Sequence, residues 1–539
     1  MDKKKRNILI TIVLLIGIVA IIGVSYALWV LNLTQQGQND IASSCFNITF
    51  TDKDNISLQK AYPILDEDGK KLTPYEFTIT NTCDSYASFN VNLEVLNTTT
   101  LTNNDAVKVM ISSKTGDTET EINTNLLSSY KTTTKTLNNA QTAFNLTTGY
   151  LNAKESKTYT LRLWLDENVD MNTEGVQNTK FSSKVVVTTS YAKEIPKSAS
   201  ETITTLVSGA NTSSTDVYTV PNKTSDSCTY TLAYDGTTDN NLRYVGANPC
   251  NYVKIDNEYW RIIGVMNNID DGTGKKETRI KLIRNESIGT YSWDSSESSV
   301  NGGYGVNEWS QADLMKLLNP GFESESVGGS LYYNNSSKNC YSSNNNGTKA
   351  CDFTSSGIKT NLKNLVGNTL WNTGSNDGVT YTYKNIITNK FYELERSSNN
   401  GKICESDSYC NDTVTRTTTW NGKIGLIYPS DYGYATSGGS TSTRTSCLNK
   451  ELYNWDSSSY SDCKNNDWLL DSIDWQWTIS PLAFSPGSYG VFGIYAVGSV
   501  DGRDARYAGL VRPSVYLISK TSILGGEGTE TNPYILLGN

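Results

Sequence analysis

The sequence predicts an N-terminal apolar helix and two domains, with a linker between the two domains. An apolar N-terminal helix (residues 1–30) is a signal peptide or transmembrane anchor, an all-β sandwich domain (31–192) follows it, and a linker (193–225) leads to an α+β domain (226–539). Three patterns predict this order. Basic residues precede a long apolar run, short segments of alternating apolar and polar residues come next, and strand and helix periodicities are mixed beyond residue 226.

The composition excludes several classes of function. The chain of 539 residues has a formal net charge of −9, whereas a nucleic-acid partner needs a basic face. Histidine is absent, which excludes Ser-His-Asp and Cys-His nucleophile pairs, histidine general bases and histidine-ligated zinc. We recognise no other catalytic constellation, so we expect a protein that is not an enzyme and uses no cofactor or metal.

The N-terminus carries an export signal. Lys3 to Arg6 precede an apolar run from Ile8 to Val24 that continues to Val30, and a basic start before an apolar segment directs export with the N-terminus inside. If it is kept, the segment 7–30 crosses the membrane once. Small residues at Ser25 and Ala27 equally permit cleavage near Ala27. We expect a protein on the extracellular face of the membrane, or one that is secreted.

Alternating apolar residues predict the strands of the first domain. They fall at 46–50, 77–79, 89–95, 107–111 and 161–165, between clusters of turn residues. The order FTITNTCDSYASFNVNLEV … LNAKESKTYTLRLWLDENV, and GVSYALW in the export signal, resemble the TasA/camelysin-type β-sandwich. That resemblance implies a matrix or fibre subunit that assembles with itself. The peptidase activity ascribed to members of that family is not expected here, because the chain has no histidine and no H-E-x-x-H motif.

Residues 193–225 are rich in Ser, Thr, Asn and Lys and show little periodicity, which indicates a linker. Val217, Tyr218 and Val220 could instead add a strand to the next domain.

The second domain opens with strands and continues with helices. Tyr252–Ile255 and Tyr259–Val265 should form a hairpin, and 279–283 a further strand. The acidic loop NNIDDGTG between the last two strands is better explained as a hairpin tip than as a calcium loop, since Ile269 stands where a ligand is needed. Three helices should follow. Their apolar positions are Leu314, Leu317 and Leu318, with Ser310 as the N-cap; Ile358, Leu362, Leu365 and Val366; and Ile386, Ile387, Phe391 and Leu394.

Strands close the chain. After a strand at 423–428, residues 475–479 alternate as in a half-buried strand, and 491–497 and 511–518 provide two more, with the loop DGRDARYAG between them. The motif W-x-W-T-x-S-P, the Gly-rich strand and the ending V-R-P-x-V-Y-L resemble the end of a C-type-lectin-like fold. Together with DNNLRYVGANPCNYVKI, EYWRIIGVM, IKLIRNESIG, NEWSQADLMKLLNPGF and IGLIYPSDYGYATSGG, they resemble a sulfatase-modifying-factor-like variant in surface proteins of low-GC Gram-positive gut bacteria. This resemblance implies that loops before the final strands meet ligands.

The ten cysteines predict disulfides, because the chain is exported to an oxidising exterior. Pairing of neighbours in sequence is the simplest arrangement, although sequence does not fix connectivity. A metal site is the weaker alternative, since no C-x-x-C occurs. Cys447 and Cys463 lie nearest by position to the reactive cysteine pair of the sulfatase-modifying relatives, but they do not have the spacing of that pair. The expected pairs are Cys45 with Cys83, Cys228 with Cys250, Cys340 with Cys351, Cys404 with Cys410, and Cys447 with Cys463.

The loop from Asp501 to Tyr507 is the candidate binding site. It combines charges of both signs with an aromatic ring, which suits stacking and hydrogen bonding to a glycan or a peptide. Alternatively, Arg503 and Arg506 pair with Asp501 and Asp504 and merely order the loop. Tryptophans 260, 293, 309, 475 and 477 are better explained as core residues in most cases. The candidate binding residues are Tyr489, Tyr495, Asp501, Arg503, Asp504, Arg506 and Tyr507, with Tyr432 and Tyr434 of a further predicted loop as a second choice.

These patterns favour adhesion or ligand binding through the second domain, with a glycan or a host or bacterial surface protein as the partner. The alternative is a structural matrix or fibre subunit assembled through the sandwich, and an enzyme of unknown type is the third hypothesis. The first two differ in that a fibre subunit forms filaments without any ligand.

Overall fold

The chain forms two compact units, residues 1–195 and 196–539. The computed structural model describes residues 62–537, except 171–175, 177–178, 193–195, 209–216, 221–222, 256–257, 296–302, 342–348, 377–381, 401–415 and 484–488, and before residue 62 only strands β1 (Trp29–Val30), β2 (Phe46–Asn47) and β3 (Ser57–Leu58). Strand exceeds helix among these residues, and the protein is β-rich.

The predicted membrane span at 7–30 lies outside the described residues except at its end. There Trp29 and Val30 pair antiparallel with β3, so a helix does not continue to Val30. Among the described residues, no helix is both long enough and apolar enough to cross a membrane.

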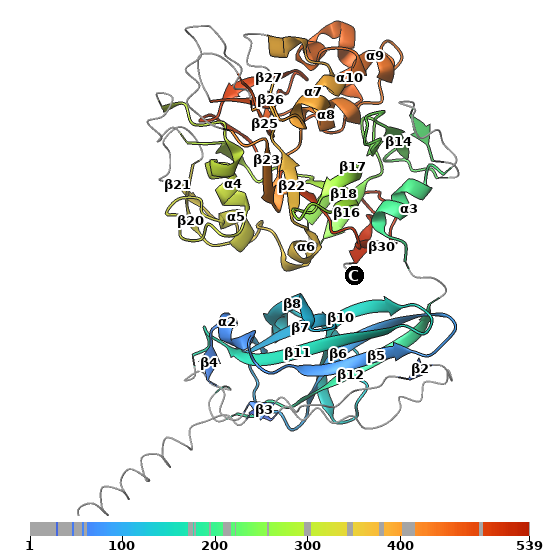
Figure 1. Cartoon of the computed structure of the whole chain (residues 1–539), viewed down its shortest axis with the longest axis vertical. Coiled ribbons are helices and arrows are strands. Elements are labelled where there is room, and N and C mark those ends of the chain that lie inside the picture. The colour runs from blue at the N-terminus through green and yellow to red at the C-terminus, as the bar shows by residue number, and fades with distance from the viewer. Residues whose placement is uncertain are drawn as a thin grey trace, which may run out of the picture. The chain divides into compact units, whose positions relative to one another are not determined.

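The first unit contains two antiparallel sheets in layers (Figure 1). One sheet has the order β12-β6-β10-β9, and the other has the order β2-β5-β11-β7-β8, with β4 parallel to β11. The helical turns are α2 (Asp66–Gly69), η1 (Asn104–Ala106) and η2 (Leu127–Ser129). The remaining strands of these sheets are β4 (Pro63–Ile64), β5 (Tyr75–Asn81), β6 (Tyr86–Leu96), β7 (Val107–Thr115), β8 (Thr118–Leu126), β9 (Lys131–Thr133), β10 (Ala140–Leu151), β11 (Ser156–Asp166) and β12 (Ser183–Ala192).

The two sheets share one apolar core, which fits a β-sandwich. The alternation predicted for β5, β6, β7 and β11 is confirmed, because the apolar residues at the alternating positions are at most 2% exposed. They are Phe77, Ile79, Phe89, Val91, Leu93, Val95, Val107, Val109, Ile111, Leu161, Leu163 and Leu165.

A large sheet forms the centre of the second unit. Its order is β13-β14-β15-β17-β18-β29-β24, and β16 pairs with β17 in the predicted hairpin. The hairpin tip between β17 and β18 is closed by Asp270, whose Oδ1 accepts hydrogen bonds from the amides of Gly272 and Gly274. The strands are β13 (Tyr218–Thr219), β14 (Thr231–Tyr234), β15 (Leu242–Tyr244), β16 (Tyr252–Ile255), β17 (Glu258–Asp270), β18 (Lys276–Arg284), β24 (Ile424–Gly425) and β29 (Ser514–Tyr516).

A second sheet has the order β19-β28-β25-β26-β27. It corrects the prediction of a DGRDARYAG loop. Asp501 to Asp504 belong to β27, which pairs with β26, and only a short turn separates β27 from β28. β25 is also buried on both faces rather than half-buried, since Gln476, Thr478 and Ser480 face other parts of this unit. The strands are β19 (Thr290–Ser292), β25 (Gln476–Pro481), β26 (Gly490–Ile494), β27 (Val500–Asp504) and β28 (Ala508–Leu510).

Short helices and two-stranded ladders surround these sheets. Figure 1 shows α7 to α10 grouped on one side of β17 and β18, and α4 to α6 on another. The ladders are β20 (Lys338–Cys340) with β21 (Lys349–Cys351), β22 (Thr369–Asn372) with β23 (Thr419–Gly422), and β30 (Ser522–Gly525) with β31 (Ile535–Leu537). The helices are α4 (Asp313–Leu318), α5 (Leu331–Asn334), α6 (Thr360–Leu365), α7 (Thr388–Glu395), α8 (Pro429–Ala435), α9 (Arg444–Leu448) and α10 (Ser461–Asn465), with 3-10 turns η4 (Trp309–Gln311), η5 (Thr382–Asn385), η6 (Leu452–Asp456) and η7 (Ser458–Tyr460).

The three predicted helices exist as α4, α6 and α7, although the cap of the first was misplaced. Ser310 lies within η4 instead of at the N-cap, because the Glu308 carboxylate accepts a hydrogen bond from its amide and starts that turn earlier. The apolar face Leu314, Leu317 and Leu318 is buried as predicted.

The stretch predicted as a linker is partly folded structure. Helix α3 (Ala199–Thr205) begins with a capping box between Ser198 and Glu201, and Ile203 is completely buried in the core of the second unit. β13 adds the strand that was the alternative prediction. The sequence did not indicate this helix, because most of its residues are polar. A helix this short needs only one apolar turn to pack against the core.

Three of the predicted disulfides are present in the second unit. Cys228–Cys250, Cys340–Cys351 and Cys447–Cys463 join Cα atoms 5.1, 5.9 and 5.5 Å apart. Cys83 is also disulfide-bonded, whereas Cys45, Cys404 and Cys410 lie outside the described residues.

Candidate functional site

Trp475 lies against two glycines of the second sheet. A Cβ atom at Gly509 would be 2.6 Å from the indole, and one at Gly493 would be 3.1 Å from it. Only glycine permits so close an approach of a flat ring to the backbone. Trp475 is half-buried, whereas the other four tryptophans weighed above are core residues at most 1% exposed: Trp260, Trp293, Trp309 and Trp477.

Arg503 lies among three aromatic rings. Tyr495 stacks on Trp475, with ring centroids 6.2 Å apart. The guanidinium carbon of Arg503 is 5.5 Å from both of these centroids and 5.4 Å from that of Tyr507. These distances allow cation–π attraction. Arg503 and Tyr507 are both exposed, so one side of this cluster faces solvent.

A second arginine continues the row of rings. The guanidinium carbon of Arg506 is 5.2 Å from the centroid of Tyr507 and 3.9 Å from that of Tyr304, and Tyr304 stacks on Tyr489 at 4.7 Å. Cations and rings therefore alternate across this surface. We call it the arginine–aromatic face, and it consists of Tyr304, Trp475, Tyr489, Tyr495, Arg503, Arg506 and Tyr507.

Backbone hydrogen bonds fix the turn that carries Arg506 and Tyr507. The amide of Ala505 donates to the Tyr489 carbonyl at 2.8 Å, and the amide of Arg506 donates to the Tyr304 carbonyl at 3.3 Å. The Ser292 hydroxyl donates to the Arg506 carbonyl at 2.8 Å. Segments far apart in sequence thus hold the turn in one position, and the face is built on rigid structure.

The alternative of internal Arg–Asp pairing holds for one arginine only. Arg506 lies 3.6 Å from Asp504, and burial raises the pKa of Asp504. Asp501 instead accepts hydrogen bonds from the Tyr383 hydroxyl and the Gly502 amide, while Arg503 makes no ion pair with any described residue. One Arg506 donor, Nε, also lacks a hydrogen-bond partner within the described part of the chain.

The second-choice residues are not at a surface. Tyr432 and Tyr434 lie in helix α8, at most 2% exposed, where a loop was predicted. Pro429 at the first helical turn and the Asp431 carboxylate, which accepts from the Tyr428 amide, begin this helix. The helix then directs both rings inward.

Sequence reasoning missed Tyr304, and it did not separate Trp475 from the tryptophans that are better explained as core residues. A signal for Trp475 was present, because two glycines in neighbouring strands leave room for a ring. Tyr304 had no such signal, since its contact with Arg506 depends on the tertiary fold.

The sequence did not predict a buried charge network on the central sheet of the second unit. Asp431 accepts from Lys281 Nζ at 2.6 Å and from Arg243 Nη1 at 2.7 Å, and Arg243 also pairs with Asp235 at 2.9 Å. Burial lowers the pKa of Lys281 to about 8 against the opposing attraction of Asp431. The cations of Lys281 and Arg243 outweigh burial and hold the pKa of Asp431 below its usual range. Each charge has a partner, so the network joins β15, β18 and α8 as a structural cross-link.

Glu395 at the end of α7 is the other strongly perturbed group. Burial raises its pKa to about 7, against the attraction of Arg396. Its carboxylate accepts hydrogen bonds from the amide and the hydroxyl of Ser430, which joins α7 to α8.

The chain matches no protein-family model, and no curated protein or solved structure is significantly similar to it. Fold and site alone therefore define its class, which is a β-rich protein with a disulfide-braced second unit and an ordered arginine–aromatic surface.

Proposed function

We propose that this is an exported cell-surface or secreted binding protein, and that its second unit holds a glycan or a surface protein on the arginine–aromatic face. The observation that supports this proposal is that Arg503 and Arg506 alternate with tyrosine rings. Arg503 and Tyr507 on this face are exposed to solvent. Arginine, tyrosine and tryptophan dominate the energetics of binding surfaces. Sugar rings and peptide groups can stack on such planes and form hydrogen bonds with their edges.

Order in the free protein supports this role. Stacking and backbone hydrogen bonds already hold these side chains, so binding costs little further conformational entropy. Trp477, Ile479 and Phe492 belong to the buried core of the second unit, whereas Arg503 and Tyr507 are exposed. Burial in the core therefore does not explain why these two side chains are ordered.

The rest of the chain fits the same proposal. The two sheets of the first unit serve as a stalk or assembly module of the TasA/camelysin type, and the second unit is a C-type-lectin-like α+β domain. The disulfides support export, because such bonds persist outside the cell.

The test is an array of glycans and of host and bacterial surface proteins, probed with the exported protein. The proposal expects saturable binding to one ligand class, lost in a variant with Arg503, Arg506 and Tyr507 replaced by Ala. Filaments formed without ligand, together with an array on which nothing binds, would contradict it and favour the matrix role.

A further inference from the structure

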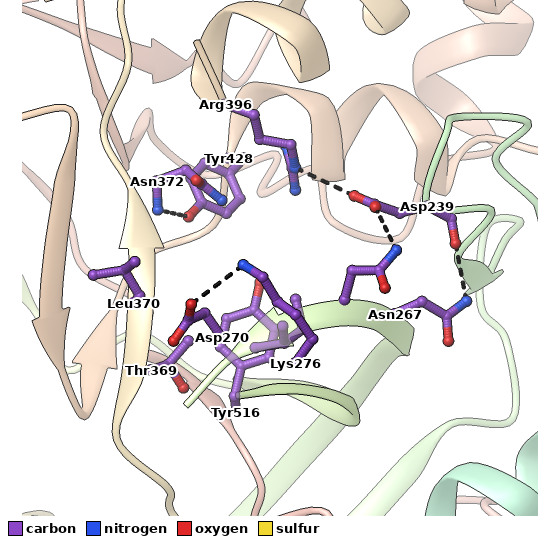
Figure 2. A pocket seen from close by; sticks show the side chains of 12 residues that line it. Asp239, Asn267, Asp270, Lys276, Thr369, Leu370, Asn372, Arg396, Tyr428 and Tyr516 are labelled. Atoms are coloured by element: carbon purple, nitrogen blue, oxygen red, sulfur yellow. Dashed lines mark hydrogen bonds and ion pairs between the residues drawn. The ribbon is translucent and has the colours of Figure 1, made fainter. Parts of the chain in front are cut away.

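A cavity of the second unit shares no residue with the arginine–aromatic face. It is a cavity of about 370 Å³ between the hairpin of β17 and β18, strand β22 and the ends of α7 and α8. Figure 2 shows Asp239 and Asn267 on one side, Asn372 and Tyr428 on the other, and Tyr516 at the floor. Its size is near the lower end of small-molecule sites, which run from roughly 300 to 1,000 Å³.

The charges that line the cavity are compensated. Asp270 Oδ2 lies 3.2 Å from Lys276 Nζ. Arg396, the other cation of the lining, lies 3.9 Å from Asp239. A phosphate would need cations in excess, and a polyamine would need carboxylates in excess. Neither excess exists here, so a neutral ligand fits this lining.

Uncommitted hydrogen-bonding groups converge on the same space. The Tyr516 hydroxyl and the Asn372 side chain have no hydrogen-bond partner among the described residues. The Tyr428 hydroxyl accepts from the Asn372 amide at 2.9 Å, which leaves its own proton to donate. In Figure 2 the Tyr516 ring rises from the floor with its hydroxyl toward the cavity.

The walls are held in place without a ligand. Asp239 accepts hydrogen bonds from the Tyr392 hydroxyl and from Asn268 Nδ2, the latter at 2.8 Å. The guanidinium carbon of Arg396 lies 3.4 Å from the centroid of the Tyr392 ring. A site ordered in this way binds a ligand with little reorganisation.

We propose that this cavity binds a neutral sugar of about one ring. A sugar hydroxyl both donates and accepts, which matches a lining that mixes carboxylate and amide acceptors with arginine, lysine and tyrosine donors. Ile269 and Leu370 also line the cavity and supply apolar side chains for the C–H groups of the ring. The site is independent of the proposed function, since the arginine–aromatic face lies on other strands.

The test titrates the full exported chain with a panel of neutral hexoses and N-acetylhexosamines at millimolar concentration, followed by saturation-transfer NMR and calorimetry. Tyr516→Phe removes one hydroxyl and keeps the ring beside Lys281, and Leu370→Trp fills the space. Tyr332→Phe is the matched control, because the Tyr332 hydroxyl is also unpartnered but lies in the closed core.

We expect at least one sugar to bind, with affinity about three- to tenfold lower in Tyr516→Phe, abolished in Leu370→Trp, and unchanged in Tyr332→Phe. The variant with Arg503, Arg506 and Tyr507 replaced by Ala should bind that sugar normally, which separates this site from the proposed one. The inference is overturned if no sugar in the panel binds, if both cavity variants bind as the parent does, or if inorganic phosphate or spermidine competes for the cavity more tightly than any sugar.

Discussion

Arg506 and Tyr304 lie face to face, with the guanidinium carbon 3.9 Å from the ring centroid, although they come from segments far apart in the chain. This contact joins the turn after β27 to the segment before η4. Without it, the rings around Arg503 and the Tyr304–Tyr489 pair would be two separate patches. With it, the arginine–aromatic face is continuous.

The first prediction concerns Gly509, which lies against the indole ring of Trp475. Gly509→Ala places a Cβ 2.6 Å from the indole, so the ring must shift. We expect a loss of about 1–3 kcal/mol in the free energy of unfolding, a change in tryptophan fluorescence, and weaker ligand binding. Gly525→Ala is the control, because nothing lies within 4 Å of a Cβ there. Equal behaviour of the two variants would show that Trp475 does not depend on this close approach.

The second prediction concerns the buried charge network. Lys281→Met leaves the Asp431 carboxylate with one cation fewer in a completely buried site, which should cost about 3–5 kcal/mol of the free energy of unfolding. Lys276→Met is the control, because the Lys276 side chain is 59% exposed and its ion pair with Asp270 should contribute under about 1 kcal/mol. Chemical denaturation of both variants measures the difference. A Lys281→Met variant as stable as the parent would contradict the cross-link.

The third prediction is a pH dependence from Glu395. Its pKa of about 7 in the folded protein lies above the ordinary value of 4.5. The folded state therefore binds this proton more tightly than the unfolded state does. This contribution to stability is complete below about pH 4.5 and is lost as the pH rises through about 7.

Glu395→Gln removes that titration. The free energy of unfolding of the variant, relative to the parent, should rise by about 3 kcal/mol between pH 4.5 and 7. The comparison with the parent is needed because burial beside Asp313 also raises the pKa of Asp294 to about 7. A difference between the two proteins that stays constant with pH would place the pKa of Glu395 at its ordinary value.

The fourth prediction concerns helix α3 in the stretch that its composition indicates as a linker. Ile203 is completely buried, so Ile203→Ala should cost about 2–5 kcal/mol. Thr205→Ala on the exposed side of the helix should change stability by less than about 0.5 kcal/mol. If both substitutions prove neutral, the segment behaves as a linker after all.

Local patterns predicted β5, β6, β7 and β11, the hairpin of β16 and β17, three apolar helix faces and three disulfides, but not β8, β10 and β12 of the first unit. Period-two alternation marked β5, β6, β7 and β11 because each has one face in the core. The same rule was too simple for β25. There Thr478 donates to the Phe492 carbonyl at 2.7 Å, which satisfies a polar residue in a buried strand.

The site was harder to predict, because its geometry depends on contacts between distant segments. The sequence identifies Arg503, Arg506 and Tyr507 as candidates, but not the ring of Tyr304 that completes the row. Tyr432 and Tyr434 look like loop residues until the bond from the Tyr428 amide to Asp431 shows where a helix begins. The cavity floor at Tyr516 lies on a short central strand whose sequence reads as core.

The most direct test of the account is the dissociation constant of the array-identified ligand for the parent and for the variant with Arg503, Arg506 and Tyr507 replaced by Ala, each measured with its unfolding curve. A second variant, Lys254→Ala with Tyr259→Ala, removes a cation–π pair elsewhere on the second unit as the control. The account predicts that only the first variant loses about thirtyfold or more in affinity, with the free energy of unfolding lowered by less than about 1.5 kcal/mol. A triple variant that melts early, yet binds its ligand normally while folded, would contradict it.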